Sequence, residues 1–263
     1  MSAGAGRLED LGRAVRDRRL SAEELVRDSL ARIDRARDLN AVIALRADAA
    51  LADARALDAA IARGEDPGPL AGLPFLSKDN EDAAGLPTTF GSLLYPDAPP
   101  AATDGVIAGR LRRAGAILVG KSNIPEFAFE GYTANRCYGT TRNPWAPAWS
   151  PGGSSGGSSA AIAAGLVPIA TATDVGGSIR IPASASGLVG LKPTAGLIGR
   201  DPILPSLDLN NHGPLASSVA DTRLLLGLLS GPVPGDPGAL PPWRPGPDAW
   251  PSRVLAAGRF IPG

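Results

Sequence analysis

Apolar and small side chains near the start of the chain recur at the spacing of an amphipathic helix. Between residues 25 and 33 they fall on one face, and Ser21 and Glu24 just before them have the spacing of a capping box. Residues 47–64 form a second such run, which ends at a glycine. The pattern therefore predicts two helices, with a short strand between them at residues 40–45.

From residue 72 the pattern changes to short apolar runs that alternate with helix-like segments. Residues 72–80 (GLPFLSKDN) and 116–121 (AILVGK) are predicted to be strands, with a helix between them over 104–115. The alternation continues in two further strand-like segments and a late helix, at 166–173, 187–194 and 217–231. Strands that alternate with helices are typical of an α/β sheet with parallel strands.

This pattern divides the chain into four segments. Residues 1–66 are predicted to form an N-terminal helical segment, and residues 67–230 an α/β core. Residues 231–251 are rich in proline, which excludes regular structure, and are expected to form a surface connection. Residues 252–263 begin like a strand and then stop, so we expect them to be the start of a second half that this sequence lacks.

Composition and charge exclude several classes of protein. The chain has 263 residues, of which 44% are hydrophobic and 20% charged, as in ordinary globular proteins. Its formal net charge is zero, so no broad basic face is expected and nucleic acid is not a predicted partner. No stretch has the ~20 apolar residues of a membrane span or the apolar core of a signal peptide. We therefore expect a cytoplasmic protein with no membrane partner.

The scarcity of cysteine and histidine narrows the chemistry. Cys137 is the only cysteine and His212 the only histidine, which excludes an intrachain disulfide and a metal site built from several thiolates or imidazoles. We therefore expect no metal and no cofactor. A hydrolase must either use His212 or work without histidine. The plainer interpretation of His212 is a turn residue whose ring is satisfied by backbone.

Eight consecutive glycine and serine residues, Gly152 to Ser159, lead into an alanine-rich run. A flexible linker is disfavoured because the tract lies inside the strand–helix alternation. The tract also matches the G-x-S-x-G nucleophile elbow, but the preceding residues NPWAPAWSP do not resemble a strand. We interpret it as a helix start whose small side chains permit close backbone approach and leave N–H groups free for an anion.

The stretch GAILVGKS, residues 115–122, matches the pattern of a phosphate-binding loop. Its middle residues Ala-Ile-Leu-Val favour a strand, and Pro125 interrupts the helix that should follow. We interpret the match as accidental.

Two windows hold candidate catalytic groups that need no histidine. Lys78 follows an apolar strand, so it is expected at a sheet end, where burial can lower its pKa and make it a base; an ordinary surface lysine is the alternative. In TDVGGSIRIP, residues 173–182, two glycines before Ser178 allow a sharp turn whose N–H groups can face an oxyanion. A plain tight turn is the alternative. Asp174 and Arg180 flank the turn and are placed to brace it.

Together these segments resemble the amidase signature family in order and spacing. The resemblance covers about residues 8–230 and is carried by GLPFLSKDN, AGAILVGKSNIPEFAFEG, the block from 139 to 196, and NNHGPLASSVADTRLLL. It implies an α/β fold with a mixed central β-sheet flanked by α-helices and an N-terminal helical segment. The chain departs from the family in having SASG (184–187) in place of the frequent AFCG, and in being much shorter.

The resemblance also implies roles for individual residues. Ser178 is the nucleophile, Ser154 is the bridging serine after a cis peptide bond, and Lys78 is the base of a Ser–cis-Ser–Lys triad. The implied oxyanion hole consists of the backbone N–H groups of Val175, Gly176, Gly177 and Ser178. The implied supporting residues are Ser155, Thr173, Asp174 and Arg180. Residues 88–95 and 127–132 are expected to contribute to the substrate pocket.

The implied function is an amidase that hydrolyses the C–N bond of a linear, non-peptide amide through a serine acyl-enzyme. Its expected partner is a small-molecule amide, with esters, carbamates and urethanes as alternative substrates, and a homodimer is a candidate assembly. Three alternatives stay open: the amidase subunit of a tRNA-dependent amidotransferase, a truncated non-catalytic scaffold, and a histidine-dependent serine hydrolase.

Overall fold

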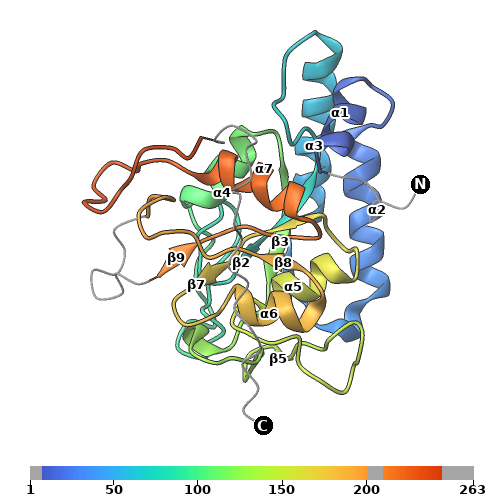
Figure 1. Cartoon of the computed structure of the whole chain (residues 1–263). Helices are drawn as coiled ribbons and strands as arrows, with labels where there is room; N and C mark the ends of the chain where they lie inside the picture. The colour runs from blue at the N-terminus through green and yellow to red at the C-terminus, as the bar shows by residue number, and fades with distance from the viewer. Residues whose placement is uncertain (1–7, 201–209, 245–263) are drawn as a thin grey trace.

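The structure, a computed structural model, describes residues 8–200 and 210–244. The predicted start of a second half, 252–263, lies outside the described residues. Helices α1 (Leu8–Arg16), α2 (Ala22–Arg35) and α3 (Ala47–Ala62) lie together on one side of the molecule (Figure 1). The predicted capping box at the start of α2 is confirmed, because Ser21 and Glu24 each accept a hydrogen bond from the other's backbone N–H.

A four-stranded mixed sheet forms the centre of the fold. Its strand order is β1 (Val42–Leu45), β3 (Ile117–Ser122), β2 (Pro74–Lys78) and β6 (Ile169–Ala170). Strand β2 runs parallel to β3 and β6, whereas β1 runs antiparallel to β3. The predicted mixed α/β sheet is confirmed, and the N-terminal segment contributes an edge strand to it as well as three helices.

Shorter elements surround this sheet. The remaining helices are α4 (Val106–Arg113), α5 (Gly156–Ala163), α6 (Arg180–Ser186) and α7 (Val219–Leu229), with 3-10 turns at η1 (Arg37–Leu39) and η2 (Glu126–Ala128). Three two-residue strand pairs complete the described part: β4 (Ala134–Asn135) with β5 (Gly139–Thr140), β7 (Thr173–Asp174) with β9 (Asn211–His212), and β8 (Val189–Gly190) with β10 (Leu215–Ala216). The described helices are all too short or too polar for a membrane span.

Successive residues of β2 and β3 point into two different hydrophobic cores. Leu76, Ile117 and Val119 belong to the core shared with α2, α3 and α5. Phe75 and Leu118 belong to the core shared with α4 and α7. Because alternate side chains of a strand face opposite sides of a sheet, a sheet covered on both faces requires continuous apolar strands. This explains the unbroken apolar runs in the sequence of these strands.

Two predicted strands are much shorter than expected. In the segment 166–173, only Ile169 and Ala170 pair with β2. The next residue, Thr171, still donates its N–H to Leu76 O at 2.9 Å, but its hydroxyl accepts the N–H of Lys78 at 2.8 Å. The Thr171 hydroxyl therefore takes the place of a backbone carbonyl as the acceptor for Lys78 N–H, and the segment after Ala170 leaves the sheet. In the segment 187–194, the strand ends at Gly190: Leu191 still donates its N–H to Pro214 O at 3.1 Å, but Pro214 has no N–H to return.

The start of α5 is packed too closely against its neighbours to admit a side chain at Gly157. A Cβ there would lie 2.3 Å from Asn123 N and 2.5 Å from Asn123 O. We expect Gly157→Ala to lower the free energy of unfolding by about 1–3 kcal/mol or more, measured by chemical denaturation. Gly131→Ala is the matched control, because nothing lies within 4 Å of its Cβ position. Equal losses in both variants would contradict the close approach.

Candidate active site

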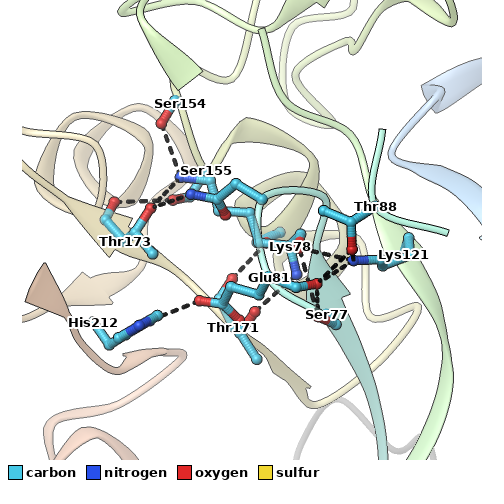
Figure 2. A network of polar contacts seen from close by, with 12 residues as sticks. Ser77, Lys78, Glu81, Thr88, Lys121, Ser154, Ser155, Thr171, Thr173 and His212 are labelled. Atoms are coloured by element: carbon cyan, nitrogen blue, oxygen red, sulfur yellow. Dashed lines mark hydrogen bonds and ion pairs between the residues drawn. The ribbon is translucent and has the colours of Figure 1, made fainter. Parts of the chain in front are cut away.

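Lys78 is the last residue of β2, at the carboxyl end of the parallel strands, and its side chain is fully buried. Its Nζ donates to Ser154 Oγ at 2.8 Å and to Thr173 Oγ1 at 2.7 Å (Figure 2). The side-chain amide of Asn80 donates to the same Thr173 oxygen at 3.1 Å. Two hydroxyl groups therefore hold the lysine head, and no carboxylate of the described residues lies within ion-pair distance of it.

Burial lowers the pKa of Lys78 to about 7, although the carboxylates of Glu81 and Asp174 act to raise it. The ordinary value for a lysine is 10.5. The apolar strand before Lys78 is the cause, because it carries the side chain into the interior at the sheet end. A substantial fraction of Lys78 is therefore neutral near physiological pH and able to accept a proton.

Ser154 is also buried, and it lies in the loop before α5 after a cis peptide bond from Gly153. The glycines of this loop allow close backbone contact, as the sequence predicts. A Cβ at Gly153 would lie 2.7 Å from the carbonyl oxygens of both Glu130 and Tyr132. No strand directly precedes the loop, so the nucleophile-elbow interpretation is rejected.

Ser178 occupies the turn between β7 and α6. It is half-buried, whereas Lys78 and Ser154 are fully buried. Its carbonyl oxygen accepts the N–H of Ser155 at 3.2 Å, which ties the two serine loops together. Within the described parts of the chain its hydroxyl has no hydrogen-bond partner. The hydroxyls of Ser154 and Ser178 are therefore not hydrogen-bonded to each other in this structure, and catalytic hydrogen bonds of this kind often tighten only when substrate binds.

Asp174 holds the turn around Ser178 in shape. Its carboxylate accepts the backbone N–H groups of Gly177 at 2.8 Å and Ile179 at 3.1 Å. Arg180 adds a two-point contact at 3.0 and 2.9 Å, as predicted from their flanking positions. Burial acts to raise the pKa of Asp174, but the hydrogen bonds from Arg180, Ile179 and Gly177 bring it below its usual value. The brace therefore stays ionised.

Of the four backbone N–H groups predicted for an oxyanion hole, one already donates to a protein acceptor. Gly177 N–H is directed to Asp174, so it is occupied by a protein acceptor. For Val175, Gly176 and Ser178, no backbone N–H bond to another described residue is present. Val175 and Gly176 are exposed, which leaves their N–H groups accessible to a ligand. These three N–H groups are the candidate anion donors of the turn.

The expected supporting residues Ser155 and Thr173 lie beside Lys78 and contact each other. Ser155 Oγ donates to Thr173 O at 3.4 Å, and Thr173 Oγ1 accepts from Lys78. The two expected pocket segments are also brought together, because the rings of Phe90, Tyr95 and Phe127 lie 5.9 to 6.3 Å apart. Their contact with a substrate stays a prediction.

Several residues near Lys78 have no signal in the sequence strong enough to single them out. Lys121 is fully buried on β3 and donates to the carbonyl oxygens of Glu81 and Lys78, the latter at 3.4 Å. Glu81 accepts from, or donates to, the ring of His212. The sequence feature that could have singled out Glu81 is its charge, three positions after a lysine that is itself predicted to be buried. Lys121 belongs to the apparent phosphate-binding loop, which is a buried strand.

The structure corrects the interpretation of His212. It is not a turn residue satisfied by backbone: it lies in β9, and its Nδ1 is 2.8 Å from Glu81 Oε1. The described residues contain no group of three or more histidine, cysteine, aspartate or glutamate side chains placed to hold a metal ion.

Comparisons with known proteins identify the family of the chain. A family model described as Amidase matches residues 24–255. A glutamyl-tRNA(Gln) amidotransferase subunit from Burkholderia pseudomallei is 46% identical over 226 residues, which cover 85% of this chain and 45% of that protein. The solved peptide amidase from Stenotrophomonas maltophilia is 38% identical with a TM-score of 0.82, over 96% of this chain and 52% of that chain.

A bacterial aryl acylamidase of the amidase signature enzymes is also similar, with 33% identity and a TM-score of 0.85 over 90% of this chain and 50% of that chain. This chain therefore spans about half the length of the curated relatives and solved structures that it matches. The family match over most of the sequence, together with the shared fold, shows that the chain belongs to the amidase signature family.

Proposed function

We propose that this chain carries the catalytic half of an amide hydrolase, with Ser178 as nucleophile, Ser154 as proton relay and Lys78 as base. The observation that supports this most is Lys78 itself, a buried lysine with a pKa lowered to about 7 and its Nζ 2.8 Å from Ser154 Oγ. A neutral amine in contact with a buried serine is the arrangement that a base needs when histidine takes no part. The single histidine of the chain is paired with Glu81 instead.

The acylation step follows from these contacts. Neutral Lys78 takes the proton of the Ser154 hydroxyl while Ser154 takes the proton of Ser178, so that Ser178 Oγ forms a bond to the amide carbon. The carbonyl oxygen becomes an oxyanion, and the N–H groups of Val175, Gly176 and Ser178 are the proposed donors that stabilise it. Ser154 then protonates the leaving nitrogen as the C–N bond breaks, and Lys78 returns its proton to Ser154.

Deacylation reuses the same groups. Water attacks the Ser178 ester and its proton passes through Ser154 to Lys78; Lys78 then returns that proton through Ser154 to Ser178 Oγ as the bond to the acyl carbon breaks and the acid leaves. Esters, carbamates and urethanes undergo the same attack and are included in the proposed substrate class. The similar structures include a peptide amidase and an aryl acylamidase, so the restriction to non-peptide amides stays a prediction.

A second candidate is favoured by the curated relatives, which are named as subunits of a glutamyl-tRNA(Gln) amidotransferase. In that case the amide would be glutamine, the product ammonia would be used by a partner, and the chain would act within a complex. Glutamine hydrolysis that appears only when partner subunits copurify would favour this candidate. Hydrolysis of anilides and esters by the chain alone would favour the first.

Trapping of an acyl-enzyme tests the proposed chemistry directly. The protein is mixed with a 4-nitrophenyl ester, quenched in acid, and measured by intact mass and peptide mapping. We expect one acyl group per chain, on the peptide that contains Ser178. A folded sample that gains no acyl group would support the non-catalytic scaffold instead, and an acyl group on another peptide would remove Ser178 as nucleophile.

A further inference from the structure

A buried carboxylate–imidazole pair lies beside Lys78 and takes no part in the proposed proton relay. Glu81 Oε1 and His212 Nδ1 are 2.8 Å apart, and their side chains are only 6% and 16% exposed (Figure 2). Removing two ionisable groups from water is costly unless they are paired. Their placement next to the lysine therefore calls for an explanation in terms of that lysine.

The pair connects the two elements that hold the lysine head. Glu81 follows β2, and its N–H donates to Lys78 O at 3.0 Å. His212 lies on β9, directly opposite Thr173 of β7. Thr173 in turn accepts the hydrogen bond from Lys78 Nζ. The Glu81–His212 contact thus links the turn after Lys78 to the strand pair that carries its hydroxyl partner.

The charges around this pair act on one another. Burial acts to raise the pKa of Glu81, but His212 chiefly, with Thr171 and Lys78, holds it below its ordinary value. The ionised Glu81 acts to raise the pKa of Lys78, against the larger effect of burial. The other charged groups that face this cluster are Lys121 on β3 with Asp79 and Asp82 beside it, and Asp174 on β7 with Arg180.

We propose that Glu81 and His212 are a positioning pair that sets how much of Lys78 is available as a base. The His212 ring, 2.8 Å from Glu81 Oε1, holds the buried Glu81 carboxylate in its ionised form, and that negative charge favours the ammonium form of Lys78. This inference rests on the proposed role of Lys78, and neither Glu81 nor His212 touches the reacting atoms.

Two variants separate charge from shape. Glu81→Gln keeps an oxygen for the His212 ring but removes the negative charge, so the pKa of Lys78 falls further. His212→Leu removes the ring that lowers the pKa of Glu81, so burial raises that pKa, less of Glu81 is ionised, and the pKa of Lys78 falls as well. We expect each shift to be roughly one pH unit. Glu81→Gln combined with His212→Leu should shift the pKa of Lys78 no further than Glu81→Gln alone, whereas two independent structural effects would add.

The composition of the chain allows a direct measurement. Lysine occurs only at positions 78, 121 and 192, and histidine only at 212. Titration of protein labelled with ¹³C at the lysine ε-carbon therefore gives three signals, which Lys192→Arg and Lys78→Met variants assign. A ¹³C-histidine label gives a single signal that reports whether His212 is charged. Neither measurement requires the protein to be active.

The expected result is a lower Lys78 midpoint in Glu81→Gln and in His212→Leu, with no further fall in the double variant. Unchanged or higher midpoints in folded variants, or additive shifts in the double variant, would overturn the inference. Labelling of Ser178 by a fluorophosphonate tests the proposed function separately. If Ser178 is unreactive while both midpoints fall, the proposed function fails and the electrostatic coupling stands.

Discussion

Replacing Ser178 with alanine is expected to abolish covalent labelling by a fluorophosphonate and to reduce amide hydrolysis by roughly 10⁴-fold or more. The oxygen that forms the acyl bond is then missing, and the buried Ser154 takes no direct part in attack on the substrate. The turn keeps its shape, because Asp174 binds the backbone of this loop and not the Ser178 hydroxyl. Loss of labelling without loss of thermal stability is therefore the expected outcome.

Ser217→Ala is the matched control for this variant, since Ser217 is exposed and lines a pocket with residues of α1 and α2 that contains none of the proposed triad. Its labelling and turnover should equal those of the unmodified chain. Undiminished hydrolysis in Ser178→Ala would remove Ser178 as nucleophile. Reaction of the probe at Ser154 or Ser155 in the unmodified chain would move the nucleophile to the glycine-serine loop.

Replacing Lys78 with methionine is expected to lower the acylation rate by roughly 10²- to 10⁴-fold, because the general base is removed while the buried volume is kept. The residual rate should no longer depend on pH around neutrality. Lys192→Met is the matched control, because within residues 8–200 and 210–244 the side chain of Lys192 donates only to the neighbouring Pro193 O. A similar rate loss in both variants would contradict the role of Lys78.

The same variant changes the dependence of stability on pH. Lys78 has a pKa of about 7 in the folded chain and 10.5 as its ordinary value, so the unfolded chain binds more protons between these values. The cost of burying this lysine is therefore fully present below pH 7 and is relieved as the pH rises towards 10.5. Lys78→Met should flatten this rise in the free energy of unfolding, measured by urea denaturation across that range. An unchanged slope would indicate that Lys78 is not titrating with a lowered pKa.

The fold follows from the sequence where one physical signal dominates. The unbroken apolar runs before Lys78 and in 116–121 predict a sheet covered on both faces. In the structure each face of the sheet packs against its own hydrophobic core. The capping box at Ser21 and Glu24 fixes the start of α2. The strands in 166–173 and 187–194 are shorter than predicted, because apolar composition does not indicate where a threonine hydroxyl replaces a ladder bond or where a proline ends the pairing.

The candidate site also contains residues that the sequence predicts and residues that it does not. The resemblance to the amidase signature family predicts Lys78, Ser154 and Thr173 as site residues, and their hydrogen bonds join residues 76 and 95 positions apart in the sequence. The contact of Glu81 with His212 spans 131 positions, and neither residue has a local pattern that reveals its partner. The use of Gly177 N–H by Asp174 depends on the shape of one turn, which glycine content alone does not determine.

The most direct test of this account is the rate of Ser178 labelling by a fluorophosphonate as a function of pH. If neutral Lys78 activates Ser178 through Ser154, the rate rises with pH, has a midpoint near the Lys78 pKa of about 7, and then levels off. A rate that rises tenfold per pH unit without levelling off would indicate attack by hydroxide or by an unassisted serine, and would contradict the lysine-based mechanism.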